Sequence, residues 1–92
     1  MGKSMEIKTF TIKNKLGLHA RVAALLAKES GRFKSNIFFE RDGMEVNGKS
    51  LLEILTLACP KGCRITIKAE GADAHDAIKC LGVLIEDKFG EN

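Results

Sequence analysis

The stretch Ser35-Asn36-Ile37-Phe38-Phe39-Glu40-Arg41-Asp42-Gly43-Met44-Glu45-Val46-Asn47 decides the fold, because it predicts two short strands joined by a tight turn. Asp-Gly between two β-forming runs is a strong hairpin signal. A hairpin pairs its strands antiparallel, so the sheet built around it is predicted to be antiparallel. Alternation along these strands predicts the side chains that face the core: Ile37, Phe39 and Val46.

The rest of the chain supplies further strands and helices on either side of this hairpin. Alternating residues predict strands over 6–12 and 64–69. Helix-forming residues and apolar spacings of three and four predict helices over 20–30, 50–57 and 74–85. The order β-α-β-β-α-β-α predicts the α+β class, an open-faced β-sandwich whose four-stranded antiparallel sheet is covered on one face by three helices. The length predicts one domain over residues 1–92.

Four residues mark the predicted helix ends. Gly31 is expected to stop the first helix. Ser50 and Glu53 fit a capping box, in which each side chain accepts the other residue's backbone N–H. Asp73 is expected to cap the last helix.

Charge and composition exclude several classes of protein. Fifteen basic and twelve acidic residues are scattered along the chain and give a net charge of +3, which argues against a nucleic-acid binder. No apolar run of ~18 residues exists to insert into a membrane, and residues 1–6 lack the apolar core of a signal peptide. The three cysteines (Cys59, Cys63 and Cys80) are too few for a disulfide scaffold, so reduced thiols and a cytoplasmic location are predicted.

One motif suggests a nucleotide site. Gly43-Met44-Glu45-Val46-Asn47-Gly48-Lys49-Ser50 matches the P-loop pattern G-x-x-x-x-G-K-[ST]. A P-loop curls its amides around a phosphate and belongs to a parallel sheet, whereas residues 44–46 are predicted to be a hairpin strand. A nucleotide binder is therefore kept only as a remote alternative.

A second motif, Gly17-Leu18-His19-Ala20-Arg21, indicates phosphoryl chemistry. It places His19 just before a helix, where free amides and the positive end of the helix dipole favour an anion and disfavour an imidazolium. Arg21 adds a guanidinium that can pair with phosphate oxygens. A phosphoryl-accepting histidine is one interpretation, and a surface histidine at a helix entrance without a role is the other.

From about residue 6 to 91, the chain resembles HPr, the histidine-containing phosphocarrier family of the phosphoenolpyruvate-dependent sugar phosphotransferase system. The resemblance rests on the second motif and on Gly48-Lys49-Ser50-Leu51, Lys61-Gly62 and Ala69-Glu70-Gly71-Ala72-Asp73. It implies that His19 takes a phosphoryl group on Nδ1 from phosphorylated enzyme I and passes it to IIA components of sugar permeases. Such a protein is a monomeric carrier with a phosphohistidine intermediate rather than a stand-alone enzyme, and it needs no metal or cofactor.

The resemblance also assigns roles beyond His19. Arg21 matches the family's phosphate-contacting arginine, while Val22 stands where the family usually has proline. Ser50 matches the serine phosphorylated by HPr kinase/phosphorylase, although a plain helix cap also explains it. A docking patch for enzyme I and its competitors is implied at Ala20, Ala24, Leu51, Leu52 and Leu55. The alternative function is a regulatory HPr-like module that acts through its phosphorylation state rather than in sugar uptake.

Three other residues are given structural interpretations. His75 is expected to be a solvated surface histidine, because no second metal ligand lies near it in the sequence. Cys59 and Cys63 are expected to be half-buried residues on either side of a turn, rather than a zinc or redox pair.

Overall fold

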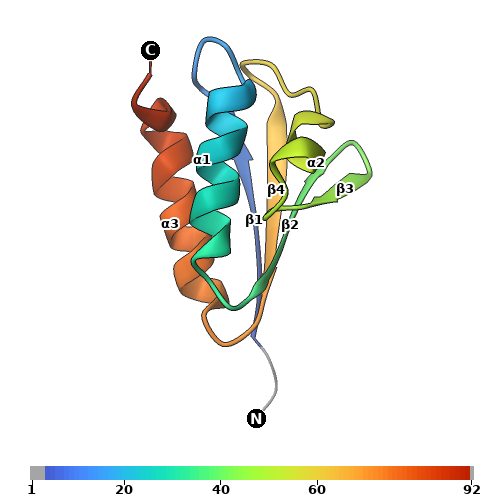
Figure 1. The fold of residues 1–92 in the computed structure, drawn as a ribbon, viewed down its shortest axis with the longest axis vertical. Coiled ribbons are helices and arrows are strands. Elements are labelled where there is room, and N and C mark those ends of the chain that lie inside the picture. The colour runs from blue at the N-terminus through green and yellow to red at the C-terminus, as the bar shows by residue number, and fades with distance from the viewer. Residues whose placement is uncertain (1–3, 92) are drawn as a thin grey trace.

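The sheet forms around the predicted hairpin. In the computed structural model, which describes residues 4–91, four strands pair antiparallel: β1 (Met5–Thr11), β2 (Asn36–Arg41), β3 (Met44–Asn47) and β4 (Arg64–Glu70). Their order across the sheet is β1-β4-β2-β3 (Figure 1). The hairpin turns at Asp42 and Gly43, whose φ angles of 50° and 83° are those of a tight turn with two left-handed residues.

The α-helices of the described range cover one face of this sheet: α1 (Ala20–Gly31), α2 (Leu51–Leu55) and α3 (Ala74–Glu86). In Figure 1 they lie in front of the strands, with α1 and α3 side by side. α3 packs on β1 and β4, and α2 packs on α1 and on the edge strand β3. The predicted α+β open-faced β-sandwich is confirmed. A short 3₁₀ turn, η1 (Lys88–Gly90), follows α3 and was not predicted.

The core lies between the sheet and the helices. The hairpin residues Ile37, Phe39 and Val46 are buried there, as predicted. Ile65 and Ile67 of β4 lie beside them, and α3 adds an apolar stripe made of Ala74, Ala77, Ile78, Leu81 and Ile85. The apolar alternation of the strands and the three-to-four spacing of α3 therefore identified the core-facing sides of these elements.

Gly82 shows how closely α3 packs on β1. A Cβ atom at this position would lie 2.8 Å from Cε1 of the buried Phe10 ring. Glycine in the middle of a helix costs about 1 kcal/mol relative to alanine. Here the absence of a side chain allows the helix to approach the strand.

The predicted capping box is half formed. The Ser50 Oγ accepts the Glu53 N–H at 3.3 Å, as expected. The Glu53 carboxylate accepts the N–H of Asn47 at 3.0 Å instead of that of Ser50. The Ser50 N–H already donates to the Asn47 carbonyl at 3.1 Å, so it does not need the Glu53 side chain.

The structure differs from the prediction at two other helix ends, the start of α3 and the end of α1. The side chain of Asp73 makes no cap bond to α3, because its carboxylate accepts the backbone N–H groups of Lys34 and Ser35, each at 2.9 Å. It therefore fastens the connection between α1 and β2 to the start of α3. Gly31 is the last residue of α1, one position beyond the predicted helix, and the C-cap residue is Arg32, whose backbone is right-handed.

The prediction of reduced thiols is wrong for one pair. Cys59 and Cys63 form a disulfide, with their Cα atoms 5.7 Å apart. The intervening turn brings them together: the Cys63 N–H donates to the Pro60 carbonyl, and Gly62 takes a φ of 91°. A distance of this size is ordinary for a disulfide. Cys80 is a free thiol on α3.

The P-loop motif does not have P-loop geometry. Residues 44–47 are extended and paired with β2, and the sheet is antiparallel. Within residues 4–91, no helix has the length and apolar character to cross a bilayer. Residues 1–3, part of the segment considered as a leader, lie outside the described range.

Candidate functional site

The loop that leads to His19 is held against the Cys59–Cys63 turn. Gly17 takes a φ of 69°, and a Cβ there would lie 2.4 Å from the Cys59 carbonyl oxygen. The next residue, Leu18, donates its N–H to that same carbonyl at 2.9 Å. Because only glycine fits this close approach in a left-handed conformation, Gly17 determines how the chain reaches His19.

His19 is the N-cap residue of α1, with extended backbone angles of −80° and 177°. Its carbonyl accepts the first helical hydrogen bond, from the Ala23 N–H at 2.9 Å. The amides of residues 20–22 precede that bond and form the positive end of the helix dipole. The imidazole is partly accessible, with 28% of the side chain exposed. The predicted position of His19 at the entrance to the first helix is confirmed.

The C-terminal segment completes the surroundings of His19. The end of α3 and the start of α1 lie at the same end of the molecule (Figure 1). There, Glu91 places Oε2 2.8 Å from His19 Nε2 and 2.9 Å from Arg21 Nε. Arg21 also donates from Nη2 to the Phe89 carbonyl at 3.1 Å. One carboxylate oxygen thus lies between the imidazole and the guanidinium.

Asn14 contributes a further side chain to this cluster. Its Nδ2 donates to Glu91 Oε1 at 3.0 Å and to the Gly17 carbonyl at 2.8 Å. These donors hold the pKa of Glu91 below its usual value, and the hydrogen bonds from Arg21 are the largest cause. The carboxylate is therefore ionised at neutral pH.

Two members of this cluster were predicted from the sequence and two were not. His19 and Arg21 belong to one motif, whereas Asn14 and Glu91 are separated by 77 positions and carried no local signal. The partner of a polar residue near a chain terminus cannot be predicted from the neighbouring sequence, because the two residues meet only in the folded structure. The burial of Phe89, which anchors the tail, was also missed.

The predicted docking and regulatory residues lie on α1 and α2, which pack against each other. Leu52 is the most exposed of the leucines, at 74%, while Leu51 and Leu55 are half-buried against the core. Ala20 is exposed and Ala24 is half-buried. Ser50 is the N-cap residue of α2 and is partly exposed.

Val22 faces away from this surface. Its side chain is fully buried in the core, on the inward side of α1. The residue that replaces the usual proline therefore contributes apolar packing at the start of the helix.

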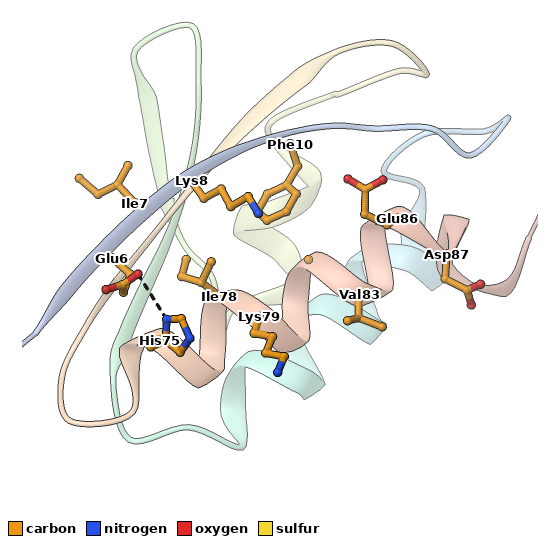
Figure 2. Close-up of a pocket in the computed structure, with 11 residues that line it drawn as sticks. Glu6, Ile7, Lys8, Phe10, His75, Ile78, Lys79, Val83, Glu86 and Asp87 are labelled. Atoms are coloured by element: carbon orange, nitrogen blue, oxygen red, sulfur yellow. Dashed lines mark ion pairs between the residues drawn. The ribbon is translucent and has the colours of Figure 1, made fainter.

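A separate groove runs between β1 and α3 (Figure 2). Phe10, Ile78 and Val83 supply its apolar part, and none of the predicted site residues line it. His75 lies at one end of this groove, 78% exposed and 3.7 Å from Glu6, as expected of a surface histidine. Among residues 4–91, no group of three or more potential ligands is placed to hold a metal ion.

Comparison with known proteins gives one family. The family model described as "PTS HPr component phosphorylation site" matches residues 7–87. The phosphocarrier protein HPr of Xylella fastidiosa is 40% identical over 82 residues, covering 89% of this chain and 92% of the relative. The HPr-like protein Crh of Halalkalibacterium halodurans is 44% identical over 79 residues, covering 86% and 94%.

The solved structures agree with this family. A crystal structure of HPr from Thermoanaerobacter tengcongensis is 46% identical, with a TM-score of 0.91, and the match covers 95% of this chain and 98% of that one. Both the sequence and the arrangement of strands and helices are therefore shared over nearly the whole chain.

Proposed function

The chain belongs to the HPr family of the sugar phosphotransferase system, and from this premise we propose that His19 is its phosphoryl acceptor. The donor is phosphorylated enzyme I, and the group then passes to IIA components of sugar permeases. The protein acts as a carrier in the cytoplasm, with a phosphohistidine intermediate and no resident metal or cofactor.

One observation supports this role most strongly. A single anionic oxygen, Glu91 Oε2, lies within hydrogen-bond distance of both His19 and Arg21. These two side chains therefore converge on negative charge beside the amides that begin α1. A phosphoryl group on the ring meets the same positive surroundings, which stabilise charge on its oxygens.

Transfer of a phosphoryl group needs little covalent work from the protein beyond placing the acceptor in line and compensating charge. The lone pair of Nδ1 forms the new N–P bond while the bond from phosphorus to the donor breaks. Arg21 supports the transferred oxygens with its planar guanidinium. All of these groups come from one chain, so the proposed carrier acts as a monomer.

Docking is proposed at the surface formed by Ala20, Ala24, Leu51, Leu52 and Leu55, next to the start of α1. The exposure of Leu52 supports this proposal, because a partner can cover it on binding. Ser50 begins the same helix, so its phosphorylation by a kinase of the HPr kinase/phosphorylase class would place charge beside the docking surface.

A regulatory role is the second candidate. The similarity to the HPr-like protein Crh favours it, since that relative is 44% identical and matches 86% of the chain. In this case Ser50 phosphorylation, rather than transfer from His19 to a permease component, carries the function.

The proposal is tested by incubating the protein with phosphoenolpyruvate and enzyme I and measuring its intact mass. We expect the wild type and His19→Ala to differ, with one acid-labile phosphoryl group on the wild type and none on the variant. His75→Ala is the matched control and should be labelled normally. Label that persists in His19→Ala would refute the assignment.

A further inference from the structure

We propose that Glu91 is a positioning residue, which keeps the proton of His19 on Nε2 and thereby presents Nδ1 as the phosphoryl acceptor. This inference rests on the proposed function of His19 and adds a residue from the opposite end of the chain. It follows from what the Glu91 carboxylate contacts, from how firmly the tail is held, and from the chemistry of a neutral imidazole.

The contacts of Glu91 give its side chain one orientation. Oε2 lies 2.8 Å from His19 Nε2, and Oε1 lies 3.0 Å from Asn14 Nδ2. Arg21 also contacts Oε2, with its Nε at 2.9 Å. Only 19% of the Glu91 side chain is exposed. Three side chains, one from the loop before α1 and two from the start of α1, therefore fix both carboxylate oxygens.

The backbone that carries Glu91 is also held in place. Phe89 is buried, at 4% exposure, in a left-handed conformation with a φ of 55°, which is unusual for a bulky residue. Its carbonyl accepts from Arg21, and the N–H of Glu91 donates to the Lys88 carbonyl at 2.8 Å. Such strained backbone persists only where its surroundings determine it. The C-terminal segment that carries Glu91 is therefore a fixed part of the site.

An ionised carboxylate accepts hydrogen bonds and cannot donate one. The ring atom that faces it must therefore carry the proton, which makes His19 the Nε2–H tautomer when the ring is neutral. Nδ1 then holds the lone pair. This arrangement follows the general rule that the hydrogen bond at one imidazole nitrogen determines the state of the other.

The same contact assists the transfer itself. When the Nδ1 lone pair forms the N–P bond and the donor keeps the electrons of the bond that breaks, the Nε2–H stays and the His19 ring gains positive charge. Glu91 lies opposite that charge, as an aspartate does beside a catalytic histidine. A carboxylate in this place favours the charged product of the step.

A competing role makes the opposite prediction. If Glu91 only occupies Arg21 until a phosphoryl group displaces it, removal of the carboxylate frees the guanidinium and speeds phosphorylation. If Glu91 positions the ring, removal slows phosphorylation and changes the tautomer.

The test uses the full chain labelled with ¹⁵N at histidine. Long-range ¹H–¹⁵N correlation at a pH where His19 is neutral reports the tautomer, and intact mass reports the initial rate of phosphorylation by enzyme I. The variants are Glu91→Ala and Glu91→Gln, since the amide oxygen of glutamine can still accept from Nε2–H. Glu86→Gln is the matched control, because this exposed carboxylate lies on the same terminal segment and pairs with Lys13.

We expect the wild type and Glu86→Gln to show the Nε2–H tautomer. Glu91→Ala should show a mixture of tautomers and a rate lower by about tenfold, as the loss of a charge-assisted hydrogen bond implies. Glu91→Gln should restore the tautomer and part of the rate. An unchanged tautomer in Glu91→Ala, or a faster rate, would overturn the inference. Failure of the wild type to accept phosphate at all would refute the proposed function, while the tautomer measurement still tests Glu91.

Discussion

Two histidines stand in this chain, and their surroundings differ. The His75 side chain is 78% exposed, and among residues 4–91 its ion-pair partner is Glu6. His19 is 28% exposed, begins a helix and shares a carboxylate oxygen with Arg21. A group that must attack phosphorus needs a fixed ring and nearby positive charge, and only His19 has both.

Arg21 should be needed for the rate of transfer. Replacing it by alanine removes the guanidinium, so we expect phosphorylation of His19 to slow by about 10- to 100-fold, an effect typical of losing one charge-stabilising donor. Initial rates with enzyme I and phosphoenolpyruvate measure this effect. Arg32→Ala is the matched control, because Arg32 is exposed and pairs with Glu29, three positions before it. Equal rates for the two variants would contradict the role given to Arg21.

Asp73 should make stability depend on pH in the acid range. Hydrogen bonds from Ser35 and Lys34 lower its pKa from 3.8 to about 2. A carboxylate with a depressed pKa stabilises the folded state above its unfolded value and loses this contribution as the pH falls through its folded value. The thermal midpoint of the wild type should therefore drop between about pH 4 and pH 2.

Asp73→Asn should be less stable near neutral pH and should lose less stability over that interval. Asp76→Asn is the control, since Asp76 lies in the first turn of the same helix. Thermal melts at several pH values compare the three proteins. Parallel profiles for the wild type and Asp73→Asn would show that this carboxylate does not provide the acid dependence.

Among the helices and strands, features that depend on neighbouring residues were predicted more successfully than features that depend on contacts between distant segments. The hairpin of β2 and β3 was predicted because its turn residues and its alternation lie within 13 positions. The capping of α2 by Ser50 was likewise a local pattern. The cap predicted at Asp73 was wrong, because its carboxylate binds the N–H groups of Lys34 and Ser35, which are distant in the sequence, instead of those of α3.

In the proposed function, the short helix α2 joins the regulatory site, Ser50, to the docking surface. Ser50→Glu places negative charge at the start of the helix, where the dipole favours it, so stability should stay the same or rise by a few tenths of a kcal/mol. The same charge at the edge of the docking surface must be desolvated or repelled by an acidic partner, which can cost several kcal/mol. We therefore expect slower phosphorylation by enzyme I without unfolding.

Ser50→Ala separates the charge from the cap in this experiment. It removes the Oγ that accepts the Glu53 N–H and should lower stability by about 1 kcal/mol while transfer continues. Thermal melts and initial rates are measured for both variants. A normal rate for Ser50→Glu would leave Ser50 as a helix cap alone.

In the molecule as a whole, the disulfide is the feature that the amino-acid composition did not predict. Three cysteines are too few for a disulfide scaffold, which favoured reduced thiols, yet the turn at residues 60–62 brings Cys59 and Cys63 together. The carbonyls of both cysteines also bind the segment before His19, through Leu18 and Ile12. The disulfide therefore lies next to the segment that leads to His19.

Reduction of this disulfide should lower the free energy of unfolding by up to about 2 kcal/mol, as the chain-entropy model gives for a loop this short. Urea unfolding with and without a phosphine reductant measures the difference. The double variant Cys59→Ala, Cys63→Ala should have the same urea midpoint with and without the reductant. Cys80→Ala should behave as the wild type. A reductant effect that persists in the double variant would exclude this disulfide as its source.

As a whole molecule, the protein is proposed to carry a phosphoryl group on His19 from enzyme I to a IIA component. The most direct measurement follows the intact mass of the wild type with phosphoenolpyruvate and enzyme I, and again after a IIA component is added. We predict a gain of one phosphoryl group, mapped to the peptide that contains His19, and its loss as the IIA mass rises. A chain that gains no phosphoryl group, or keeps it while an active IIA component stays unmodified, would contradict the account.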